Sequence, residues 1–137
     1  MNGLHILAEF HDCDGERRLL LDAATLAVLC RGACDRAGLA VVAEAFYQFP
    51  GAGATGALVL AESHLAIHTW PELNAVTLDL YVCNHSQDNR AAAERAYQAL
   101  QTRFKPRRTV RRDVIRGGLD PAGSDPYSTS DIAERSE

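Results

Sequence analysis

One stretch of this chain alternates strictly between apolar and other side chains. From Val76 to Cys83, valine or leucine occupies every second position, with threonine, aspartate, tyrosine and cysteine between them. Successive side chains of a β-strand point to opposite faces, so the pattern predicts a strand with one buried face. The other face carries Asp79 and Cys83, which are chemically reactive residue types. The fold must therefore cover one side of this strand and can present chemistry on the other.

The rest of the chain supplies elements of two kinds. Apolar residues at helical spacing predict one helix between Asp22 and Gly38, and a second that Ser86 or Asp88 begins and Pro106 ends. The resulting order, β-α-β-β-β-β-α-β, predicts an α+β two-layer sandwich, with an antiparallel-rich sheet and two helices on one of its faces. The other strand-like runs cover residues 4–10, 39–49, 57–61, 65–69 and 107–116.

The chain has the length of one domain. With 137 residues, it matches the prior of ~100–200 residues per domain. We assign residues 1–118 to this single domain. Residues 119–137 are rich in Asp, Ser, Pro and Glu and are predicted to be a disordered tail. No apolar run approaches the ~20 residues of a membrane span, and the first residues do not resemble a signal peptide, so we expect a cytoplasmic protein without a membrane partner.

Basic residues concentrate near the end of the predicted domain. Seven of the 14 Lys and Arg residues lie within residues 103–116, although the formal net charge is −4. Such a segment is either a nucleic-acid patch or a solvated strand face. No aromatic side chains for base stacking are interleaved with the basic residues from Lys105 onward. We therefore favour the strand face and expect no nucleic-acid partner.

The four cysteines form no recognisable framework. Cys13, Cys30, Cys34 and Cys83 include no CxxC pair, and a zinc site would need three or four ligands. Cys30 and Cys34 are spaced one helical turn apart. We interpret this pair as packing residues, since free cysteine is among the residue types most often buried.

Chemistry-bearing side chains are densest between Glu62 and Glu72. These eleven residues include two acids, two histidines, a serine and a tryptophan. A Ser-His-acid hydrolase would need a Gly-x-Ser-x-Gly elbow, which Ser63 lacks. A metal site from His64, His68 and Glu72 is disfavoured, because the two histidines would lie ~13 Å apart along a strand. A third possibility is self-processing, in which Ser63 attacks the preceding carbonyl in an N→O acyl shift.

The run Ala61–Glu72, AESHLAIHTWPE, resembles the self-cleavage motif of the short bacterial and archaeal S-adenosylmethionine decarboxylases. The resemblance extends in order from residue 3 to about residue 117. It includes Gly3-Leu4-His5 with Cys13, Phe49 with the loop Gly53–Gly56, the strand Asp79–Cys83, and Arg116-Gly117.

The resemblance implies a chain that makes its own cofactor. Cleavage between Glu62 and Ser63 would give a β chain of residues 1–62 and an α chain of residues 63–137. Ser63 would become a pyruvoyl group, which forms a Schiff base with the substrate amine and replaces pyridoxal phosphate as electron sink, without a metal. By the same resemblance His68 is the base for ester elimination, Thr55 supports processing, and Cys83 is the proton donor in decarboxylation.

The resemblance also implies a substrate and an assembly. Phe49, Trp70 and Glu72 would bind S-adenosylmethionine, and its decarboxylated product would supply spermidine biosynthesis. An acidic body suits this cationic substrate. Pyruvoyl-dependent ornithine or arginine decarboxylase is the alternative. A homodimer of αβ units would pair its sheets (αββα). Asn84 departs from the glycine that relatives often carry after the Cys83 position, which puts the loop presenting the thiol in question.

Overall fold

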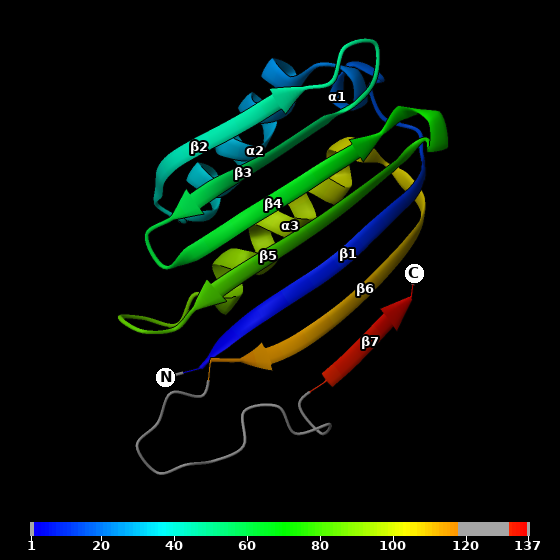
Figure 1. Ribbon diagram of the computed structural model, residues 1–137. Helices are drawn as coiled ribbons and strands as arrows, with labels where there is room; N and C mark the ends of the chain where they lie inside the picture. Colours follow the sequence, from blue (N-terminus) through cyan, green and yellow to red (C-terminus); the bar gives the residue numbers. More distant parts are fainter. Residues whose placement is uncertain (1, 118–131, 137) are drawn as a thin grey trace.

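The computed structural model describes residues 2–117 and 132–136. The chain forms one antiparallel sheet with helices on a single face (Figure 1). The strands are β1 (Gly3–Cys13), β2 (Val41–Gln48), β3 (Ala54–Leu60), β4 (Ser63–Trp70), β5 (Ala75–Cys83), β6 (Pro106–Arg116) and β7 (Ile132–Ser136). The helices are α1 (Arg18–Leu21), α2 (Ala23–Ala37) and α3 (Arg90–Phe104), with a short 3₁₀ turn, η1 (Pro71–Leu73).

The strand order in the sheet is β2-β3-β4-β5-β1-β6-β7, and every neighbouring pair is antiparallel. Figure 1 shows α2 and α3 side by side behind the sheet, so the face toward the viewer is left open. This arrangement confirms the predicted α+β two-layer sandwich. The open face is the surface on which functional side chains can gather.

The alternation in β5 separates core from open face as predicted. Val76 and Leu80 are fully buried under the helices, whereas Asp79 and Cys83 are only half-buried on the opposite side. The neighbouring strand β1 follows the same rule, with Ile6 and the other apolar side chains of its inward face in the core. A period of two thus assigns each side chain to a face once the strand exists.

The two longer helices, α2 and α3, end where the sequence predicts, but α3 begins later in the chain than predicted. Gly38, at φ 91°, follows α2, as expected for a glycine that closes a helix. The helix α3 begins after Asn89, and not directly after Ser86 or Asp88. Ser86 instead bonds the side chain of Glu62, and Asp88 accepts from the backbone N–H of Arg90. The segment between β5 and α3 therefore belongs to the surroundings of Glu62.

The basic segment is a strand, as predicted, but only some of its basic side chains are exposed to solvent. Arg111 is only 4% exposed and faces α3. Its guanidinium donates to Glu94 at 2.8 Å and to Asp113 at 2.7 Å. Because alternate residues of β6 point toward the helix layer, one arginine of the run becomes a buried ion-pair centre, while Arg107 and Arg108 remain exposed.

The cysteines confirm the packing interpretation. Cys13, Cys30 and Cys34 are free and buried, and Cys83 is free and half-buried. At the other end of the chain, the predicted disordered tail is wrong for Ile132–Ser136, whose backbone pairs with β6. Residues 118–131 and 137 lie outside the described residues. Within the described part, no helix combines the length and apolar character needed to cross a membrane.

Candidate functional site

Ser63 stands at a strained position at the start of β4. Its φ is 137°, in a region that residues with a side chain rarely adopt. The carbonyl oxygen of the preceding Glu62 accepts a hydrogen bond of 2.9 Å from the backbone N–H of Cys83. Cys83 is the last residue of β5, and its half-buried thiol lies on the open face. The register of the sheet therefore brings Ser63, the Glu62 carbonyl and Cys83 to one end of the sheet.

Thr55 and His68 form a second group. They face each other across β3 and β4, and Thr55 Oγ1 lies 2.5 Å from His68 Nδ1. The ring of His68 is exposed on the open face, so this single contact orients it without burying it. The structure thus pairs two of the residues that the resemblance had named separately, Thr55 and His68.

The predicted substrate-binding residues gather around the second group. Phe49, Trp70 and Glu72 line a pocket of about 250 Å³ together with Thr55 and His68. Gly53 also lines it, where a Cβ would lie 2.3 Å from the carbonyl oxygen of Thr69. The glycine-rich loop can therefore pack directly against the end of β4. The pocket offers two exposed aromatic rings and one carboxylate to a ligand.

The two groups lie far apart along the strands. Five residue steps along β4 separate Ser63 from His68, which corresponds to about 16 Å at ~3.3 Å per residue. Cys83 lies beyond Val82, the residue that pairs with Ser63, whereas His68 pairs with Thr77. One chain therefore does not bring its own Ser63 and His68 within reaching distance of each other.

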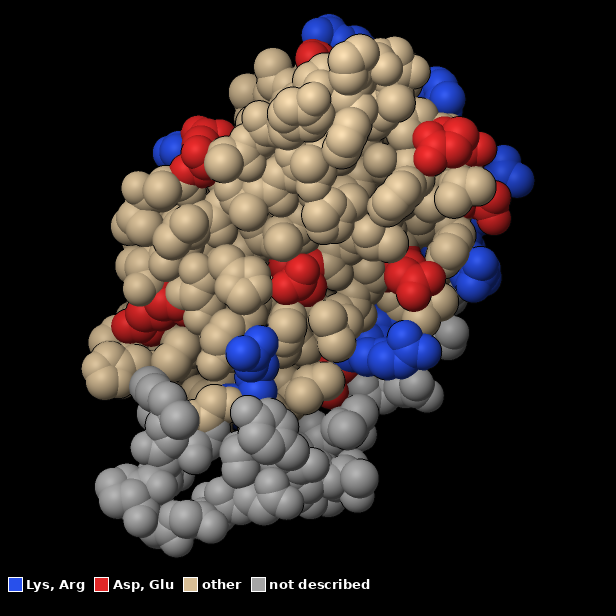
Figure 2. All heavy atoms as spheres, in the orientation of Figure 1, with Lys and Arg blue, Asp and Glu red and all other residues tan. Residues whose placement is uncertain are grey.

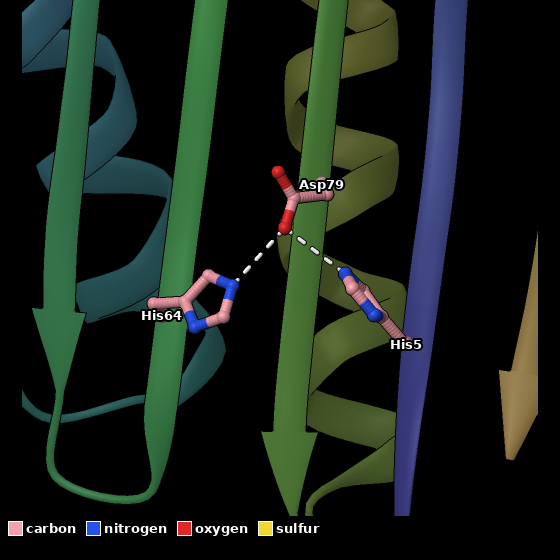
Figure 3. Close-up of side chains that lie close together, drawn as sticks. All are labelled: His5, His64 and Asp79. Atoms are coloured by element: carbon pink, nitrogen blue, oxygen red, sulfur yellow. Dashed lines mark hydrogen bonds and ion pairs between the residues drawn. The ribbon is translucent and has the colours of Figure 1, made fainter. Parts of the chain in front are cut away.

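A side-chain network stands on the open face beside the Ser63 end. His5 and His64 both bond the same oxygen, Asp79 Oδ2, at 2.9 and 3.0 Å (Figure 3). Arg116 donates to His5 Nδ1 at 3.1 Å and stacks on the ring of Tyr81 at 4.3 Å. These residues come from β1, β4, β5 and β6, so the network ties four strands together next to Ser63.

The same three ligand atoms raise the question of a metal ion. One ring nitrogen of each histidine and a carboxylate oxygen of Asp79 lie within 4.8 Å of one another, close enough for one ion to bridge. A guanidinium only donates, so Arg116 makes Nδ1 of His5 the acceptor and leaves the ring proton on Nε2. That proton occupies the position where a metal would bind. The geometry therefore fits a hydrogen-bonded network better than a metal centre.

The sequence analysis assigned no role to this network or to Asn89, and it named Ser86 only as a possible helix start. The alternation in β5 had placed Asp79 on the face opposite the core, whereas His64 was weighed only as a ligand in a disfavoured metal site. The missing information was the pairing between strands, since His5 and Arg116 join them only through the register of β1 with β5 and β6. Among the described residues, His64, His68 and Glu72, the metal set that the sequence analysis disfavoured, do not form a cluster of possible ligands.

Comparisons with known proteins agree on one family. The family model described as S-adenosylmethionine decarboxylase matches residues 4–117. The S-adenosylmethionine decarboxylase proenzyme of Thermoplasma volcanium is 36% identical over 117 residues, which cover 85% of each chain. That of Aquifex aeolicus is also 36% identical, over 84% of this chain and 81% of the relative. A crystal structure of the adenosylmethionine decarboxylase from Aquifex aeolicus superimposes with a TM-score of 0.78 at 33% identity, covering 90% of this chain and 97% of that one.

Proposed function

Because the chain belongs to the S-adenosylmethionine decarboxylase family, we propose that it is a self-processing, pyruvoyl-dependent S-adenosylmethionine decarboxylase. Its product would supply spermidine biosynthesis. The observation that carries the self-processing is the geometry at the Glu62–Ser63 bond, where a serine with φ 137° follows a carbonyl held by the N–H of Cys83. The relatives described above are named for S-adenosylmethionine, and none of them supports the ornithine or arginine alternative.

The proposed cleavage begins with Ser63. Its Oγ attacks the carbonyl carbon of Glu62 and the hydroxyl proton passes to the Ser63 nitrogen. The C–N bond then breaks, which leaves an ester and a free amine. Negative charge develops on the carbonyl oxygen during the attack, and the Cys83 N–H is already hydrogen-bonded to that oxygen. Strain at Ser63 is relieved when the peptide bond opens, because the serine is then freed from its constrained backbone.

A base completes the cleavage by removing the Cα proton of Ser63. The bond between Cβ and Oγ breaks, and Glu62 leaves as a carboxylate that ends the β chain. The dehydroalanine that remains rearranges to an imine, takes up water and loses ammonia, which leaves the pyruvoyl group. We assign the proton removal to His68, whose ring Thr55 orients.

The pyruvoyl carbonyl supplies an electron sink for the carbon that loses carbon dioxide. We assign to Cys83 the return of a proton to that carbon. Its thiol is free and half-buried at the same end of the sheet as Ser63. A thiol carries a proton that it can give up to a carbanion, so it can act as a general acid.

The separation of the two groups leads us to propose that each active site is shared by two chains. In a two-fold dimer the same patch of both subunits meets itself, so the Ser63 end of one chain can face the His68 end of the other. The open face suits such contact, since Leu7, Tyr47 and Val59 are exposed on it. Figure 2 shows few charged side chains in the middle of this face, while Lys and Arg gather toward β6.

The pocket near His68 is the proposed binding place for the adenosyl end of the substrate. Phe49 and Trp70 expose ring faces that can stack on adenine and attract the sulfonium cation. Glu72 can accept hydrogen bonds from ribose hydroxyls. In the shared-site arrangement this pocket lies in the chain that supplies His68.

Mass spectrometry of the denatured protein tests the proposal directly. We expect two fragments, residues 1–62 and 63–137, with a pyruvoyl mass on the second, and release of carbon dioxide from S-adenosylmethionine. Ser63→Ala should stay intact, and Cys83→Ala should be cleaved but lose turnover. An intact wild-type chain after prolonged incubation would refute self-processing, and faster turnover of ornithine or arginine would refute the substrate.

A further inference from the structure

The side chain of Glu62 is held by the loop that follows Cys83. Its carboxylate accepts from the Ser86 backbone N–H at 3.2 Å, from the Ser86 hydroxyl, and from Asn89 Nδ2 at 2.5 Å. The Ser86 hydroxyl, followed by Asn89, holds the pKa of Glu62 below its usual value. A carboxylate with three donors is fixed in orientation as well as charge.

Asn89 links the Glu62 carboxylate to the backbone of Cys83. The same Nδ2 donates to the carbonyl oxygen of Cys83 at 2.9 Å, while the N–H of Cys83 donates to the carbonyl of Glu62. Glu62, Cys83 and Asn89 therefore form a closed ring of hydrogen bonds beside the Glu62–Ser63 bond. Asn89 is only 5% exposed, and its side chain makes no capping bond to α3. Helix capping therefore does not explain why an asparagine side chain is buried at this position.

The loop itself is braced by Asn84. Its Oδ1 accepts from the backbone N–H of Asn89 at 2.9 Å. This is the residue that departs from the glycine expected after Cys83. The bond fixes the curvature of the loop and the direction in which the amide of Asn89 points.

Ser63 is thus held from both sides. Upstream, the Ser86–Asn89 clamp fixes the side chain of Glu62. Downstream, His64 is fixed to Asp79, as Figure 3 shows. A residue in a sparsely populated backbone region persists only when its surroundings determine it, and these two anchors flank the position with φ 137°.

We infer that Asn89, assisted by Ser86, is a positioning residue for self-cleavage, which acts by holding Glu62 so that its carbonyl faces both Ser63 and the Cys83 N–H. This inference rests on the proposed function and extends it to residues outside the reacting atoms. Asn89 touches no reacting atom. It affects the first step, the N→O acyl shift, because that step requires the Glu62 carbonyl in a defined orientation.

The test follows cleavage in pulse-labelled, cell-free translated chains. Asn89→Asp keeps the shape of the side chain but sets a second carboxylate against Glu62, and we expect cleavage to slow by about 10- to 100-fold. Asp88→Asn is the matched control, because Asp88 is exposed in the same loop and bonds Arg90 instead of Glu62. It should cleave at the wild-type rate.

A partner exchange separates positioning from general destabilisation. Glu62→Gln combined with Asn89→Asp swaps donor and acceptor across the same contact, so the double variant should cleave faster than Asn89→Asp alone. Hydroxylamine attacks esters much faster than amides. If the N→O acyl shift is the impaired step, little ester forms in Asn89→Asp, and hydroxylamine should leave its slow cleavage unchanged. Full rescue by hydroxylamine would show that the ester forms normally and would overturn the inference.

Failure of the inference is distinct from failure of the function. An uncleaved wild-type chain contradicts the proposed self-processing. Wild-type cleavage with an equally fast Asn89→Asp variant contradicts only the role of Asn89. Thermal melting of the uncleaved Ser63→Ala background checks that each variant folds. If Asn89→Asp fails to fold, Ser86→Ala is tested in its place. A wild-type cleavage rate in Ser86→Ala would then contradict the inference that these hydrogen bonds position Glu62.

Discussion

Ser63 begins strand β4 and His68 lies five residues further along it, where its ring bonds Thr55 on the neighbouring strand instead of approaching Ser63. The resemblance had assigned both residues to one reaction. A strand is nearly inextensible, so the intervening residues keep the two side chains about 16 Å apart within one chain. A second copy of the chain is the simplest source of the missing group.

Complementation between two inactive chains is the first prediction. Ser63→Ala and His68→Ala chains, each uncleaved alone, should give partial cleavage when they are co-expressed. A mixed dimer then retains one complete site, formed by Ser63 of one chain and His68 of the other. Mass spectrometry should find cleavage only in the chain that carries His68→Ala. If that chain stays intact in isolated mixed dimers, the two residues do not work across subunits.

The hydrogen bond between Thr55 and His68 should influence the rate of processing. Thr55→Val preserves the shape but removes the hydroxyl, which leaves the exposed ring free to rotate. We expect cleavage to slow by about three- to tenfold, the worth of one ordinary hydrogen bond. Thr55→Ser keeps the hydroxyl and serves as the control, with a rate near wild type. The rates can be read from denaturing gels, and equal rates for both variants would remove Thr55 from processing.

The buried arginine of β6 should matter for stability and not for cleavage. Arg111→Ala leaves the carboxylates of Glu94 and Asp113 without their shared cation beneath α3. Loss of one partner from a buried pair typically costs about 3–5 kcal/mol. We expect a loss near the lower end, because Glu94 is partly exposed. Urea denaturation measures it, with exposed Arg108→Ala as a control that changes stability by less than about 0.5 kcal/mol.

Stability should fall at alkaline pH because of the buried thiols. Burial raises the pKa of Cys13 and of Cys34 to about 11, and also raises that of Cys30. In the unfolded chain these groups ionise near pH ~8.5. Below that pH their contribution is fully present. Above it the unfolded state binds fewer protons than the folded state, so the free energy of unfolding decreases as pH rises toward 11.

Urea denaturation at several pH values under reducing conditions measures this alkaline loss. Cys34→Ala removes one such group. The free energy of unfolding of this variant should therefore fall less steeply with pH than that of the wild type, and the two slopes should differ by up to ~1.4 kcal/mol per pH unit. Parallel curves for the variant and the wild type would show that the Cys34 thiol does not contribute.

Local patterns in the sequence were sufficient for most secondary structure and for the sides of the sheet. The alternation in β5 assigned Asp79 and Cys83 to the open face, because a period of two acts within a single strand. Gly38 ended a helix for an equally local reason. The loop after β5 was less predictable, because Asn89 and Ser86 donate hydrogen bonds to Glu62, a residue more than twenty positions away in the chain.

The sequence by itself determined the layer architecture and, through one specific motif, the candidate cleavage site at Ser63. Only the tertiary structure decided which groups meet. Strand register brought Cys83 to the Glu62 carbonyl, His5 to Asp79, and Thr55 to His68. The physical reason is that side-chain patterns encode which face a residue takes, whereas distances between residues far apart in sequence depend on how strands and loops pair.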